Sequence, residues 1–108
     1  MKAAGPAMYL VQILLPAFDN EGQEFPAELF ESIAGELTLR FGGLTAYIRS
    51  PAEGRWKQAD QTDYDEIIVL EVMAEAFDRD WWRALRARLE REMRQKEVVI
   101  RATQIERI

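Results

Sequence analysis

Residues 8–16 read "MYLVQILLP", and residues 67–75 read "IIVLEVMAE". Both runs are almost continuously apolar, and Gln12 and Glu71 are the only polar residues inside them. A strand that is buried on both faces loses the usual alternation of polar and apolar residues. The two runs are therefore predicted to be the central strands of one sheet.

Two shorter runs, residues 44–50 and 97–105, alternate in the manner of edge strands and carry Arg49, Arg101 and threonines. Between the strands, apolar residues at helical spacing predict a helix from Pro26 to Phe41, ended by the glycines at 42 and 43. A second helix is predicted over 78–95, with a cap at Asp78 or Asp80. Its predicted apolar stripe is Trp81, Leu85, Leu89 and Met93, with Trp82 beside it.

The predicted order is β-α-β-β-α-β, which is the ferredoxin-like arrangement of the α+β class. In that fold a four-stranded antiparallel sheet carries two helices on one face, and the first and third strands are central. This agrees with the two apolar runs. We expect residues 8–108 to form a single domain and residues 1–7 to be a loose tail.

The composition excludes several kinds of chemistry. The 108 residues contain no cysteine and no histidine, so thiol chemistry, histidine-based nucleophile pairs and zinc sites are not expected. We predict no metal and no cofactor.

The net charge is −5, and residues 1–77 carry five basic and thirteen acidic side chains, a balance of −8. Nucleic acid is therefore not expected as a partner, because neutralisation of phosphates by basic side chains supplies most of the affinity of proteins for nucleic acid.

The N-terminal apolar run is too short for a membrane helix, which needs roughly 20 residues. It fits a buried first strand better than a signal peptide. Together with the absence of cysteine, this favours a cytoplasmic protein without membrane contact.

The face of the sheet away from the helices, called here the open face, must meet water or a partner. Alternation assigns to it Leu10, Gln12, Leu14, Thr45, Tyr47, Arg49, Ile67, Val69, Glu71, Met73, Val99, Arg101 and Thr103. An apolar patch of this size rarely faces bare water in a monomer. We therefore predict a homo-oligomer, with a dimer favoured.

The polar residues of the open face allow two interpretations. Gln12, Arg49, Glu71 and Arg101 could pair across an oligomer interface. Alternatively, they could line a cavity for a small polar or anionic ligand, with an arginine supplying two parallel donors. Glu71 is the strongest candidate for an acid or base, and Tyr47 is the second catalytic candidate.

Two features of the stretch 40–56, "RFGGLTAYIRSPAEGRW", need separate interpretations. The glycine pair stands where a helix ends, and that end of the helix dipole repels anions, so the pair is interpreted as a structural stop. Trp56 lies in a polar stretch beside Arg55 and Lys57. It is predicted to pack the loop onto a neighbouring surface or to cover a bound ligand.

The segments "FGGLT", "GRW" and "RQKEVVI" occur in this order between residues 41 and 100. The series resembles that of small, uncharacterised families of the domain-of-unknown-function type. The resemblance implies a ferredoxin-like domain of the dimeric α+β barrel kind, and it carries over no activity and no catalytic residue.

The sequence thus predicts a small homo-oligomeric binding or regulatory domain whose open face serves self-association or ligand binding. The alternative is a cofactor-free enzyme, similar to a monooxygenase or isomerase, with a pocket between the sheet and the helices.

Overall fold

The computed structural model describes residues 8–49 and 66–108. In chain order its elements are β1 (Met8–Pro16), α1 (Ala27–Phe41), β2 (Thr45–Arg49), β3 (Ile67–Ala74), α2 (Arg79–Glu92) and β4 (Val99–Ile105). The expected tail and Trp56 lie outside these residues. The strand boundaries agree with the expected ones to within two residues, and α2 ends three residues earlier than predicted.

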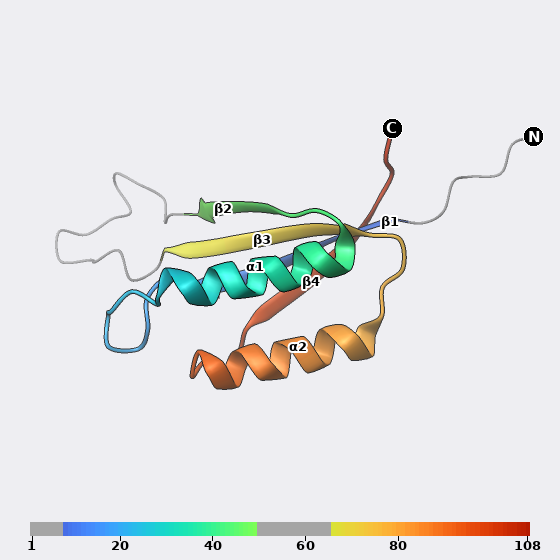
Figure 1. Cartoon of the computed structure of the whole chain (residues 1–108). Helices are drawn as coiled ribbons and strands as arrows, with labels where there is room; N and C mark the ends of the chain where they lie inside the picture. The colour runs from blue at the N-terminus through green and yellow to red at the C-terminus, as the bar shows by residue number, and fades with distance from the viewer. Residues whose placement is uncertain (1–7, 50–65) are drawn as a thin grey trace, which may run out of the picture.

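The four strands form one sheet in the order β2-β3-β1-β4 (Figure 1), and every neighbouring pair is antiparallel. This is the ferredoxin-like arrangement, and it confirms that the two apolar runs are the central strands. β1 pairs with β3 on one side and with β4 on the other, so its backbone groups are used along most of its length.

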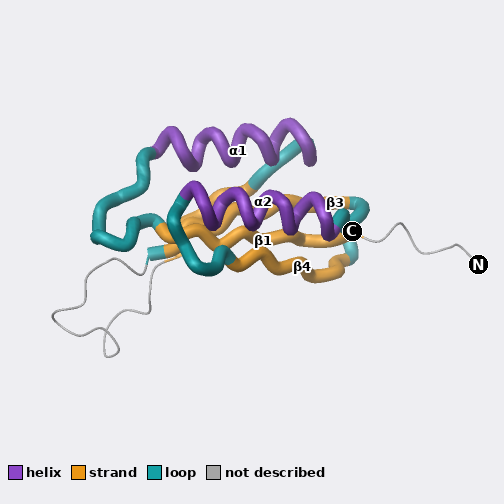
Figure 2. The backbone as a smooth tube through the Cα atoms, turned by 90° about the horizontal axis from the view of Figure 1, so that it is seen from below, coloured by secondary structure: helices purple, strands orange, loops and turns teal. Residues whose placement is uncertain are grey.

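Both helices cover the same face of the sheet (Figure 2). Their apolar stripes meet the alternate residues of the central strands, because successive side chains of a strand point to opposite faces. The buried cluster between the layers consists of Val11, Ile13, Leu15, Ile33, Leu37, Leu70, Val72, Trp82, Leu85, Leu89, Met93 and Val98. Transfer of this apolar surface out of water is the main term that holds the helices on the sheet.

The ends of the helices follow the capping rules that the sequence suggested. The Asp78 carboxylate accepts a hydrogen bond from the Trp81 backbone N–H at 3.1 Å, which identifies Asp78 as the cap of α2. Gly42 closes α1 in the left-handed conformation, with φ of 82°, and its N–H donates to the Thr38 carbonyl at 2.8 Å. The interpretation of Gly42 as a structural stop is confirmed.

The tryptophan pair differs from the prediction. Trp82, rather than Trp81, is buried with Leu85 and Leu89, and Trp81 is half-buried at its flank. Trp82 stands three residues before Leu85, a spacing that places both on one helix face. Trp81 packs edge-on against the Phe41 ring, with centroids 5.5 Å apart.

Charged side chains also join the two helices to each other. Arg88 of α2 donates two hydrogen bonds to the Glu36 carboxylate of α1, one of them at 3.1 Å. Glu90 of α2 accepts a hydrogen bond from the Val98 N–H at 2.9 Å and so holds the residue that directly precedes β4. No helix within the described residues is long and apolar enough to cross a membrane.

Candidate functional site

Four polar side chains gather at the centre of the open face. Gln12 of β1 stands opposite both Glu71 of β3 and Arg101 of β4. Tyr47 of β2 stands opposite Val69, two residues from Glu71 on the same face. We call Gln12, Tyr47, Glu71 and Arg101 the polar quartet. One residue comes from each strand, so the quartet spans the whole width of the sheet.

The quartet is a continuous chain of hydrogen bonds. Gln12 donates from Nε2 to Glu71 Oε2 at 2.8 Å and accepts at Oε1 from Arg101 Nε at 2.7 Å. The Tyr47 hydroxyl donates to the same Glu71 Oε2 at 3.1 Å and lies 3.3 Å from Gln12 Nε2. Because the Gln12 amide is used at both ends, it fixes the spacing between the acid and the guanidinium.

Two sets of polar atoms in the quartet are left available. Within the described residues, Glu71 Oε1 has no hydrogen-bond partner, and the two terminal nitrogens of Arg101 have none either. The quartet therefore offers an oriented acceptor and an oriented pair of donors from one face. Such an arrangement can bind a polar ligand or a matching protein surface.

The electrostatics of the quartet act on Tyr47. Partial loss of hydration raises the pKa of the Tyr47 phenol above its ordinary value of 10.0, and the hydrogen bond to Glu71 and the negative charge of Glu71 raise it further. Gln12 and Arg101 oppose this shift. Tyr47 is thus held as a neutral hydroxyl that donates to the carboxylate at neutral pH.

Around the quartet, the open face is apolar and partly exposed. Met73 is 47% exposed, and Tyr47 and Val99 are each 41% exposed. Val69 differs from the expectation of an open position, because it is only 1% exposed although its register places it on this face.

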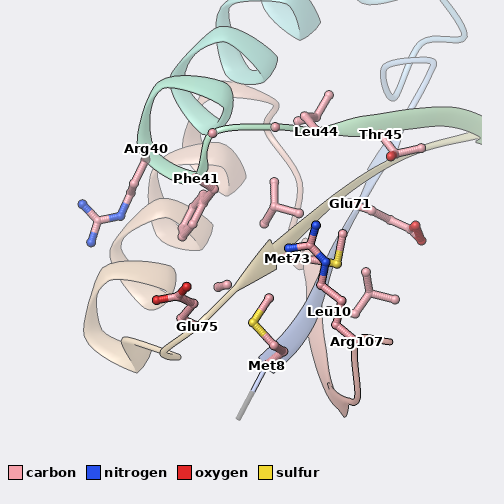
Figure 3. A pocket seen from close by; sticks show the side chains of 14 residues that line it. Met8, Leu10, Arg40, Phe41, Leu44, Thr45, Glu71, Met73, Glu75 and Arg107 are labelled. Carbon is pink, nitrogen blue, oxygen red and sulfur yellow. The ribbon is translucent and has the colours of Figure 1, made fainter. Parts of the chain in front are cut away.

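A half-open hollow of about 590 Å³ borders Glu71 at the end of the sheet where β2 begins (Figure 3). We call it the Glu71 pocket. Its lining residues are Met8, Leu10, Arg40, Phe41, Gly42, Gly43, Leu44, Thr45, Glu71, Val72, Met73, Ala74, Glu75 and Arg107. A volume between roughly 300 and 1,000 Å³ is usual for small-molecule sites.

The charged groups of the pocket have different orientations. The Arg107 guanidinium lies among the lining side chains, whereas that of Arg40 points away from them (Figure 3). Arg40 lies over the Trp81 ring, 4.3 Å from its centroid, which holds it to the helix layer. Arg107 has no ion-pair partner among the described residues, so it is the cation available to a ligand.

The structure brings together four of the six candidates from the sequence, namely Gln12, Tyr47, Glu71 and Arg101. Arg49 ends β2 opposite Ile67, and only its backbone is described. The sixth candidate, Trp56, lies outside the described residues. The part of the chain that the structure describes contains no cluster of acidic residues able to hold a metal ion.

Sequence reasoning missed the pocket itself and the position of Arg107 in its lining. The pocket lies at the end of the sheet, whereas the space between the sheet and the helices contains the buried apolar cluster. The signal was the glycine pair, which ends α1 and delays the start of β2 until Thr45. The role of the glycine pair as the end of α1 was predicted, but its effect on where β2 starts was not.

Comparison with known proteins supports the fold and leaves the family open. No family model matches the sequence, and no curated protein matches it. Among solved structures, the chain is similar to a phage SAM lyase in complex with S-methyl-5′-thioadenosine, with a TM-score of 0.58 and 14% sequence identity. The match covers 96% of this chain and 86% of the lyase chain. At this identity the likeness shows the fold, a small α+β domain of the same arrangement.

Proposed function

We propose that this chain binds a small nucleoside-type ligand in the Glu71 pocket. The observation that carries the proposal is the position of Glu71, whose Oε2 is held by Gln12 and Tyr47 while its Oε1 stays available beside a hollow of about 590 Å³. An oriented carboxylate is the group that dinucleotide-binding proteins use to accept ribose hydroxyls.

The walls of the pocket suit such a ligand. Met8, Leu10 and Met73 supply apolar and thioether surface, and Arg107 supplies a cation. Glu71 and Glu75 make a phosphorylated ligand unfavourable, so a nucleoside fits better than a nucleotide. The structural neighbour was solved with S-methyl-5′-thioadenosine, an uncharged nucleoside thioether, which makes this compound the first probe.

Isothermal titration with S-methyl-5′-thioadenosine tests the proposal. We expect saturable binding that Glu71→Gln weakens by about tenfold or more, because a hydrogen bond to a charged group is worth roughly 1.5–3 kcal/mol. Glu97→Gln is the matched control, since Glu97 is exposed outside the pocket. Absence of binding, or equal weakening by both variants, would contradict the proposal.

The second candidate function is self-association through the open face, and it is favoured by a different observation. The face combines exposed apolar side chains with the available acceptor of Glu71 and the available donors of Arg101. In a twofold dimer the same patch meets itself, so Arg101 of each copy can approach Glu71 of the other. We infer a homodimer stacked sheet to sheet.

Native mass spectrometry tests the dimer, with Val99→Lys as the disrupting variant. Val99 is 41% exposed on the open face, and Ile48→Lys is the matched control because Ile48 is 62% exposed on the opposite side of the sheet. We expect a dimer that only Val99→Lys dissociates. A monomer at all accessible concentrations would refute the dimer.

The enzyme alternative stays a hypothesis that rests on the hydrogen bond between Tyr47 and Glu71. It predicts that turnover of a bound nucleoside is lost in Tyr47→Phe while its binding remains. The cytoplasmic location and the single domain of residues 8–108 likewise stay proposals, supported by the absence of cysteine and by the shared buried cluster.

A further inference from the structure

Strand pairing is missing on one side of the end of β3 at the Glu71 pocket. β2 begins at Thr45, opposite Glu71, whereas β3 continues to Ala74 and still pairs there with Tyr9 of β1. The last three residues of β3, numbers 72–74, therefore have a partner strand on one side only. All three line the pocket.

The alternation of hydrogen bonds along an antiparallel pair identifies which backbone groups of residues 72–74 point toward the side that β2 leaves unpaired. We call this unpaired side the gap. In an antiparallel pair, opposite residues alternate between exchanging and not exchanging backbone hydrogen bonds. One step beyond the last register pair of β1 and β3, Ala17 N–H donates to the Glu66 carbonyl at 3.0 Å. The even-numbered residues of β3 therefore direct their backbone groups toward β1, and the odd-numbered residues direct theirs toward β2.

Pro16 supports this assignment independently. It stands opposite Ile67, and a proline has no N–H to donate, so this pair cannot exchange two hydrogen bonds. By the same alternation, the N–H and C=O of Met73 point toward the side of β2. Neither group has a hydrogen-bond partner among the described residues.

The end of α1 prevents β2 from continuing into the gap, whereas the pocket leaves the gap open to a ligand. A continued β2 would place Gly43 opposite Met73, but the chain there belongs to the end of α1. Phe41 and Leu44 flank the glycines in the pocket lining and are half-buried. The free edge thus presents one donor and one acceptor beside apolar surface, and it is too short to pair with another strand.

We propose that the peptide edge of Met73 recognises the adenine base of the nucleoside, an inference that rests on the proposed ligand class. Adenine displays N7 as an acceptor and the N6 amino group as a donor side by side. The Met73 N–H donates to N7, and its C=O accepts from N6. Glu71 lies two residues along the same strand, roughly 7 Å away, where it can accept the ribose hydroxyls.

The experiment compares S-methyl-5′-thioadenosine with 5′-methylthioinosine by isothermal titration to the full chain. The inosine base carries a carbonyl in place of the N6 amino group, so an acceptor would face the Met73 carbonyl. We expect the inosine compound to bind about 10- to 100-fold more weakly, because a buried polar group without a partner is costly. Equal binding of the two compounds would overturn base recognition and leave the proposed function intact.

A second readout follows the backbone directly. In ¹⁵N-resolved NMR, the amide proton of Met73 is expected to shift and to exchange more slowly when S-methyl-5′-thioadenosine binds. The Val72 amide is the matched control, because it already faces β1. Binding without any change at Met73 would overturn the inference, and no binding of either compound would overturn the proposed function as well.

Discussion

Replacing each glycine of the pair at residues 42 and 43 with alanine separates a conformational requirement from a steric one. Gly42 has φ of 82°, whereas Gly43 is not among the described residues with positive φ. A Cβ atom at either position would meet no heavy atom within 4 Å apart from those of its own chain neighbours. The two substitutions therefore differ only in backbone conformation.

The magnitude follows from two opposing terms. A left-handed conformation costs a non-glycine residue about 1–2 kcal/mol. Loss of glycine freedom in the unfolded chain returns about 0.4–1 kcal/mol. Gly42→Ala should thus lower the free energy of unfolding by about 1 kcal/mol. Gly43→Ala should leave it unchanged or raise it by up to about 1 kcal/mol.

Urea unfolding with a common slope measures both values. Gly42→Asn is a further check, because asparagine tolerates the left-handed region better than alanine and should recover part of the loss. The hydrogen bond from the residue 42 N–H to the Thr38 carbonyl is kept in all variants. Equal destabilisation by the two alanine variants would refute the conformational argument.

Three further changes have defined outcomes. Trp82→Ala should lower the free energy of unfolding by about 3–5 kcal/mol in urea, since Trp82 is only 3% exposed within the core. A double-mutant cycle of Arg88→Gln and Glu36→Gln should give a coupling free energy of unfolding of about 0.5–1 kcal/mol, because both side chains are partly exposed. A coupling of zero would show that the ion pair does not stabilise the fold. Glu71→Gln should bring the pKa of Tyr47 back toward 10.0 in an ultraviolet titration. Folding raises the pKa of Tyr47, so the stabilisation that this shift gives the folded protein is present below pH 10.0 and is lost as the pH rises through the pKa of Tyr47 in the folded protein. An unchanged titration of Tyr47 in Glu71→Gln would contradict the contribution assigned to Glu71.

The sheet was predictable because its pattern is local. Near-continuous apolar runs distinguish the central strands from the edges, and their only interior polar residues, Gln12 and Glu71, had to share the face that lacks helices. The structure confirms this pairing directly, at 2.8 Å. Alternation alone then placed Tyr47 and Arg101 beside them.

The remainder depended on contacts that no local pattern encodes. Trp81 and Trp82 are adjacent and identical, both stand at helical spacing from Leu85, and the Phe41 ring of the other helix packs against both of them, so the pattern of α2 alone did not show that Trp82 is the buried one. The partner of Arg88 lies 52 residues away in sequence. The Glu71 pocket arises because β2 starts two residues too late to cover Met73, which leaves the last three residues of β3 without a partner on that side.

Glu71 belongs both to the polar quartet of the open face and to the lining of the pocket, and this connects the two proposed functions. Its Oε2 is occupied by Gln12 and Tyr47, so a ligand and a second copy of the chain would both turn to Oε1. Two binding events that share one acceptor are thermodynamically linked, and each must change the affinity of the other by the same factor. A nucleoside on Oε1 would exclude Arg101 of a second copy from that atom, so ligand binding would weaken a sheet-to-sheet dimer, and the dimer would weaken ligand binding equally. If the chain both dimerises and binds a nucleoside as proposed, the quartet would make self-association a means of regulating the pocket, rather than a function separate from it.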